Sequence, residues 1–163
     1  MGSGLYWSLT AVLVAVLVGI AVWAYQTANR LDRLHVRYDL SWQALDAALG
    51  RRAVVARAIA ADVGDARLAG LADAAERAPR SAREGCENEL STELSQIDPD
   101  TVRPALAAEL AEAESRMLLA RRFHNDAVRD TLALRERRPV RWLKLGGHAP
   151  LPTYFEIAEP AQR

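Results

Sequence analysis

A chain of 163 residues is long enough for one domain with a hydrophobic core and short for two. Apolar residues make up 50% of it and aromatic residues only 6%, with much Ala, Leu, Arg and Glu, which is the composition of a helical protein. The 21 Lys and Arg balance 21 Asp and Glu, so charge gives no reason to expect nucleic-acid binding, and the single cysteine excludes an intrachain disulfide and a cysteine-based metal cluster.

The first predicted element is an apolar run from Leu5 to Gln26 that contains no charged residue. As a helix it is roughly 33 Å long at 1.5 Å per residue, which spans the hydrocarbon core of a bilayer. Tyr6 and Trp7 lie at one end and Trp23 and Tyr25 at the other, the placement of aromatic belts at the two membrane interfaces. We therefore predict a transmembrane helix.

A buried core helix and a cleaved signal peptide are the alternatives for this run. A core helix would need a partner on every face, and a signal peptide normally has a basic residue before its apolar segment. No Lys or Arg precedes Arg30, whereas Arg30, Arg33 and Arg37 follow the run. We therefore expect residues 1–29 to be an N-terminal tail and an uncleaved anchor, with the short N-terminus outside and the rest of the chain in the cytoplasm.

Small residues recur every four positions within the run, at Ala11, Ala15 and Gly19. Such a ridge lets another membrane helix approach closely, so it is a candidate surface for self-association or for docking to another membrane protein. In an alanine-rich chain the same spacing also arises by chance.

Residues 30–138 have the period of amphipathic helices and are predicted to form a helical bundle. The first helix should continue from the anchor and end near Val63, because Gly64 suits the left-handed position after a helix and Asp65 can cap the next one. Its apolar stripe is Leu31, Leu34, Tyr38, Trp42, Leu45, Leu49, Val55 and Ile59.

The second helical region runs from Asp65 to Ile97 and is interrupted at Pro79. Proline removes a backbone donor, and Ser81 with Glu84 three residues later has the pattern of a capping box. We expect a kink or two collinear pieces, with Leu90, Leu94 and Ile97 on the buried side.

The third helix is predicted from about Thr101 to Arg137, and an extended tail, residues 139–163, should pack on or near the distal end of the bundle. Apolar spacings of four and three residues mark the stripe of this helix: Leu106, Leu110, Ala113, Met117, Ala120, His124, Ala127, Thr131 and Leu134. The predicted fold is thus all-α, with an anchor helix followed by an antiparallel up-down-up bundle of three long helices.

The up-down-up order bears on the basic cluster from Arg135 to Lys144, because it places the end of the third helix about 50 Å from the membrane. The cluster is then a solvated helix end or a partner site, with lipid or nucleic acid less favoured. The candidate partner surface comprises Arg51, Arg52, Arg116, Arg138, Arg141 and Lys144.

Polar side chains border the apolar stripe of the third helix in the segment ESRMLLARRFHN. We hypothesise an interhelical network in which Arg121 bridges Glu114 and Asp46 while Asn125 satisfies a neighbour. Such a network would fix helix register; ordinary solvent-facing residues are the alternative. The set is Trp42, Asp46, Glu114, Arg121, His124 and Asn125.

Catalytic and cofactor motifs are not found. His35, His124 and His148 lie far apart in the sequence and form no His-x₃-His pair, and there is no glycine-rich phosphate loop or nucleophile elbow. We expect no cofactor, no metal and no small-molecule substrate, with His124 a satisfied core histidine.

Three stretches together resemble the LemA family of bacterial membrane-anchored helical proteins. WQALDAALGRR carries Trp42, Asp46 and the paired Arg51 and Arg52. PTYFE lies in the tail. ESRMLLARRFHNDAV carries Glu114, Arg116, Arg121 and Asn125, with His124 where the family usually has Tyr. The resemblance implies an extracellular N-terminus, one transmembrane helix in the bacterial inner membrane and a cytoplasmic bundle.

The expected function is that of a membrane-anchored, non-enzymatic scaffold or interaction protein of the LemA type. Its expected partners are the bilayer and either a membrane protein or a second copy. One alternative is an accessory subunit of an inner-membrane protease or transport assembly that docks through the anchor helix. The other is a hydrolase whose site has no recognised motif.

Overall fold

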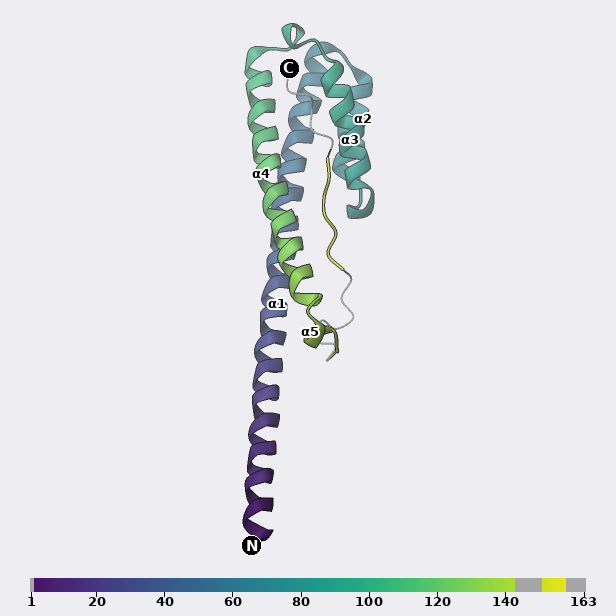
Figure 1. Cartoon of the computed structure of the whole chain (residues 1–163). Coiled ribbons are helices and arrows are strands. Elements are labelled where there is room, and N and C mark those ends of the chain that lie inside the picture. Colours follow the sequence, from purple (N-terminus) through teal and green to yellow (C-terminus); the bar gives the residue numbers. More distant parts are fainter. Residues whose placement is uncertain (1, 143–150, 158–163) are drawn as a thin grey trace.

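The computed structural model describes residues 2–142 and 151–157, and this part of the chain is helical apart from short connections and residues 151–157. Figure 1 shows a long rod whose upper half is covered by the other helices. The elements are α1 (Gly2–Val63), α2 (Ala66–Arg77), α3 (Arg80–Gln96), the 3₁₀-helix η1 (Pro99–Thr101), α4 (Pro104–Arg135) and α5 (Arg138–Trp142).

The first third of α1 projects beyond the bundle as a single helix (Figure 1). Its described apolar side chains from Tyr6 to Val22 are exposed, because no other described element covers them. Within the described residues, α1 is the one helix long and apolar enough to cross a membrane, by length and composition.

The end of α1 agrees with the sequence prediction. Gly64 has a φ of 76°, in the left-handed region that glycine adopts without strain. The Asp65 carboxylate then accepts hydrogen bonds from the backbone amides of Arg67 and Leu68 and so caps α2. The chain reverses direction here.

The break at Pro79 is a second reversal, so the predicted kink or collinear arrangement is wrong. Arg67 near the start of α2 pairs with Glu93 near the end of α3 at 3.3 Å, which requires the two helices to be antiparallel. Ala78 is extended and Pro79 has no amide to continue a helix. The predicted capping box of Ser81 and Glu84 is also wrong, because α3 begins at Arg80 without a side-chain cap.

This additional reversal changes the direction of α4, so the up-down-up order is wrong as well. Asp62 pairs with Arg103 at 2.6 Å, near the upper end of both helices. Arg37 pairs with Asp130 at 3.2 Å, far down α1 and near the end of α4. Helix α4 therefore runs antiparallel to α1 and returns toward the apolar end of α1 (Figure 1).

The predicted apolar stripes of α1 and α4 are confirmed, since their members are buried or half-buried along the contact between these helices. Three apolar clusters follow one another down the bundle. The upper one joins α1, α2, α3 and α4, the middle one includes Leu45, Leu49 and Met117, and the lowest consists of Leu31, Leu134 and Val140, with Leu34 against it.

Residues 151–157, here called the tail segment, run extended along the middle of the bundle (Figure 1). They do not lie at its distal end, where the sequence analysis placed the tail. Since α4 descends, α5 lies at the lower end of the bundle, below the tail segment (Figure 1).

Candidate functional site

The middle of the bundle contains a buried network of charged side chains from three helices. Arg52 on α1 is 1% exposed and donates from Nη1 to Oε2 of Glu87 at 3.1 Å and from Nη2 to Oγ of Ser91 at 3.0 Å. Its Nη2 also lies 3.4 Å from Oε1 of Glu114 on α4. Arg52 thus links α1, α3 and α4.

A second arginine completes this network. Nε of Arg83 donates to Oε1 of Glu87 at 3.1 Å, and Nη1 lies 3.1 Å from Oδ1 of Asp46. Glu87 is fully buried, and each of its carboxylate oxygens accepts a hydrogen bond from one of the two guanidinium groups. Burial raises the pKa of Glu87, and the charges and hydrogen bonds of the two arginines oppose that effect.

The predicted polar residues are in contact networks, but with other partners than those hypothesised. Asp46 pairs with Arg83 and Glu114 with Arg52, so the two carboxylates do not depend on a bridge from Arg121. Arg121 donates from Nη1 to the Ile157 carbonyl oxygen at 3.1 Å. The set therefore divides between the buried network and a site for the tail segment.

Asn125 binds the backbone of the tail segment through both atoms of its amide. Its Nδ2 donates to the Phe155 carbonyl oxygen at 3.1 Å, and the Phe155 amide donates to its Oδ1 at 2.9 Å. The side-chain amide thus replaces the main-chain partner that a neighbouring strand would supply. These contacts and that of Arg121 are made to main-chain atoms.

The side chains of the tail segment supply apolar contacts. Phe155 is 4% exposed and Ile157 is 6% exposed, and both belong to the middle apolar cluster with Leu45, Leu49 and Met117. The Phe155 ring also packs edge-on against Trp42, with centroids 5.8 Å apart. The groove between α1 and α4 therefore holds the segment by its backbone and by two apolar side chains.

His124 lies next to this groove and is buried, as predicted for a satisfied core histidine. Its Nδ1 is 3.0 Å from Oγ of Ser41, and its ring packs against Tyr38 and Trp42. Burial lowers the pKa of His124, the charge of Arg80 lowers it further, and a backbone hydrogen bond with Thr153 partly offsets both.

Arg80 covers the two aromatic rings of α1 from outside. Its guanidinium lies 4.1 Å from the Trp42 ring centroid and 4.6 Å from that of Tyr38, within cation–π range. An open cleft of about 630 Å³ lies here, and its lining includes His124 and the tail residues Leu151, Thr153, Tyr154 and Phe155.

The predicted partner surface is not a single surface. Arg52 is buried, which corrects its assignment to this surface, because the α2–α3 hairpin brings Glu87 against it. Arg51 and Arg116 are exposed and pair with Glu109 and Glu112. Arg138 and Arg141 lie at the other end of the bundle, and Lys144 is outside the described residues.

The small residues of the apolar run and His35 lie outside the buried network and the site of the tail segment. Ala11, Ala15 and Gly19 are exposed on the projecting part of α1. His35 is half-buried on α1, whereas His148 lies outside the described residues. Among the residues that the structure describes, no group of three or more His, Cys, Asp or Glu side chains could hold a metal ion.

The α3 side of the network, which was not predicted from the sequence, consists of Arg83, Glu87 and Ser91. A signal was present, since these residues recur every four positions beside Leu90 and Leu94. Polar residues at that spacing, on the border of an apolar stripe, are candidates for a buried network when a second helix brings counter-charges.

No protein-family model matches the chain, and neither does any curated protein or solved structure. The resemblance to LemA proteins accordingly stays a prediction from three short stretches of sequence.

Proposed function

We propose that the protein is a membrane-tethered interaction module whose bundle binds extended peptide segments without catalysing a reaction. In this proposal α1 crosses the membrane and the bundle lies in the cytoplasm, as expected of a scaffold of the LemA type. The observation that carries the proposal is the tail segment held in the groove between α1 and α4.

The polar contacts of the groove are suited to many sequences, because they bind main-chain atoms. Asn125 satisfies the amide and carbonyl of one residue, and Arg121 satisfies the carbonyl two residues later. Side chains two residues apart on an extended segment point to the same side, so Phe155 and Ile157 can both enter the apolar cluster. The preferred ligand is therefore an extended segment with the pattern aromatic, any residue, aliphatic.

The tail segment then acts as an intramolecular ligand. Because it belongs to the same chain, its effective concentration at the groove is on the order of millimolar, and a free peptide must compete with it. A partner segment binds well only when the tail segment has left the groove, or when the partner binds the groove more tightly than the tail segment does.

A peptide-binding experiment on the full chain tests this function. A fluorescent peptide with the sequence LPTYFEI is titrated onto the wild type and onto Phe155→Ala, in which the tail segment loses its main apolar anchor. We expect binding to Phe155→Ala and much weaker binding to the wild type. The matched control is Tyr154→Ala, because Tyr154 is 46% exposed and its loss should not free the groove.

A modified peptide makes the test specific for the backbone contacts. Methylation of the amide nitrogen at the Phe position removes the hydrogen that Asn125 accepts, and should abolish binding to Phe155→Ala. Equal binding of the methylated peptide, or no binding of either peptide to Phe155→Ala, would contradict the proposed function.

The two alternative functions, an accessory subunit and a hydrolase, predict different experimental results. An accessory subunit that docks through Ala11, Ala15 and Gly19 should copurify with a stoichiometric membrane protein and lose it on Ala15→Leu, irrespective of the groove. A hydrolase should turn over substrate in an activity screen.

A further inference from the structure

The lower end of the bundle brings α4 and α5 back to the end of the apolar run of α1. Val140 of α5 is 1% exposed and packs in one cluster with Leu31 of α1 and Leu134 of α4. Leu31 is only five residues beyond Gln26, which is roughly 8 Å along a helix. Helix α5 is therefore fixed at the level where the apolar run gives way to charged residues.

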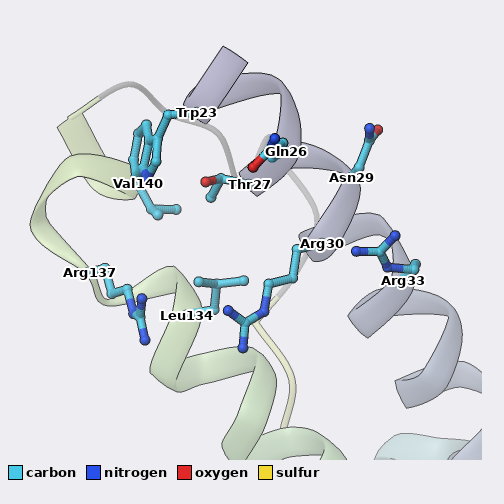
Figure 2. A pocket seen from close by; sticks show the side chains of 9 residues that line it. All are labelled: Trp23, Gln26, Thr27, Asn29, Arg30, Arg33, Leu134, Arg137 and Val140. Atoms are coloured by element: carbon cyan, nitrogen blue, oxygen red, sulfur yellow. The ribbon is translucent and has the colours of Figure 1, made fainter. Parts of the chain in front are cut away.

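Arginines from both chain segments gather at this level. We name them the basic collar: Arg30, Arg33, Arg137, Arg138 and Arg141. Figure 2 shows Arg30 and Arg137 on either side of Leu134, with Arg33 one turn further along α1. The carboxylates within the same stretches, 27–36 and 132–142, are Asp32 and Glu136.

Most arginines higher on the bundle, such as Arg51, Arg57 and Arg103, form ion pairs with carboxylates. Among the described residues, no ion pair joins Arg30, Arg33, Arg137, Arg138 or Arg141 to a carboxylate. An excess of positive charge is thus concentrated at one level of a chain whose net charge is zero.

Between these arginines lies an open pocket with an apolar wall. Its volume is about 430 Å³, and Trp23 and Val140 line it together with Arg30, Arg33 and Arg137 (Figure 2). Trp142 follows directly and is 91% exposed. Indole rings beside guanidinium groups are typical of the membrane–water interface, where the rings contact acyl chains and the cations contact phosphates.

We propose that the basic collar binds the headgroups of anionic phospholipids in the bilayer that α1 crosses. This inference rests on the membrane tether in the proposed function and is independent of peptide binding. The collar lies within about two helical turns of the apolar run, at headgroup depth, and guanidinium forks match phosphate oxygens in geometry and charge. The pocket between Arg30, Arg33 and Arg137 takes one headgroup, and Arg138 and Arg141 attract others.

The test uses the full chain in nanodiscs that contain equal amounts of dioleoyl-phosphatidylglycerol and dioleoyl-phosphatidylcholine. Native mass spectrometry then measures which lipids stay bound when the protein is released. We expect the wild type to retain phosphatidylglycerol in preference. Substituting Arg137, Arg138 and Arg141 by Gln should reduce this preference by roughly fivefold for each arginine that contacts the surface.

Two further triple variants separate charge at this level from charge in general. Substituting Arg51, Arg116 and Arg122 by Gln removes the same charge from exposed positions higher on the bundle, and should leave the preference unchanged. Substituting Arg137, Arg138 and Arg141 by Lys keeps the charge and should retain most of the preference for phosphatidylglycerol. Inorganic phosphate at millimolar concentration should compete weakly, because the apolar wall adds affinity for a lipid that free phosphate lacks.

Three results would overturn the inference. One is equal retention of both lipids by the wild type in nanodiscs, which leaves the membrane tether intact. Another is an equal loss of preference in the two Gln variants. The third is a chain that does not enter nanodiscs at all, which refutes the tether in the proposed function as well.

Discussion

The arginines in the middle of the bundle and those of the basic collar are chemically identical but have opposite surroundings. Arg52 and Arg83 are buried and share the carboxylate of Glu87, whereas Arg137, Arg138 and Arg141 have no described carboxylate partner. The role of an arginine in this protein therefore depends on which helix lies beside it. An arginine that pairs with a carboxylate of the chain fixes the positions of helices. An arginine without such a partner can bind an external anion.

Loss of Glu87 should have the largest effect on stability. Glu87→Ala leaves two buried guanidinium groups without their shared carboxylate, which should reduce the free energy of unfolding by roughly 3–5 kcal/mol. Chemical denaturation of the full chain in detergent, followed by circular dichroism, measures the change.

The matched control is Glu109→Ala, which breaks the exposed pair with Arg51 and should change the free energy of unfolding by at most about 1 kcal/mol. Equal effects of the two substitutions would remove the distinction between buried and exposed charges.

A smaller effect is expected from Asn125→Leu, which keeps the approximate size of the side chain and removes both hydrogen bonds to Phe155. The binding of the tail segment should be weakened by roughly 1–3 kcal/mol, so that the segment opens roughly 5 to 150 times more often. Hydrogen exchange of residues 151–157 measures this opening. Unchanged protection would show that apolar contacts alone hold the tail segment.

Protonation of His124 should also weaken the middle of the bundle. Burial and Arg80 lower the pKa of His124 in the folded state below its ordinary value of 6.5, so folding favours the neutral ring. The unfolded chain therefore takes up a proton first, and stability should fall as the pH decreases through 6.5 toward the lowered value. Asp39 and Glu84 also line this cleft.

Thermal unfolding at pH values on both sides of 6.5, for the wild type and for His124→Gln, isolates this contribution. The variant should show a flatter dependence of Tm on pH. An equally steep decrease of Tm with falling pH in the variant would assign the effect to other titrating groups. Glu87 is not one of them, because its raised pKa makes stability increase as the pH falls.

The smallest effect on stability is expected in the basic collar. Substituting Arg138 and Arg141 by Gln removes no described ion pair, so Tm in a zwitterionic detergent should stay within error of the wild type. A clear decrease would show that these arginines stabilise the fold, as the buried arginines do.

Much of the local structure follows from the sequence. The apolar stripes of α1 and α4 and the turn at Gly64 and Asp65 were predictable, because they depend on residues three and four apart or on backbone preferences. The long apolar helix followed from its composition. These features need no knowledge of which helix lies beside which.

The arrangement of the helices was not predictable, because a proline such as Pro79 is compatible both with a kink and with a reversal of the chain. The reversal places Glu87 beside Arg52, which turned a predicted surface arginine into a buried one. It also sends α4 downward, so the described part of the basic cluster, residues 135–142, lies at the level of Leu31 rather than at the opposite end of the bundle. The tail contacts of Asn125 and Arg121 depend on the same geometry.

Paired spin labels measure the direction of α4 in the full chain, with Cys86→Ala as background. One pair is Asp32→Cys with Glu136→Cys, and the other is Asp32→Cys with Asp100→Cys. An antiparallel α4 predicts a short distance for the first pair, set by roughly 10 Å between packed helix axes plus the label arms. It predicts on the order of 45 Å for the second pair. The reverse order, with Asp100 near Asp32 and Glu136 far from it, would show instead that α4 runs parallel to α1.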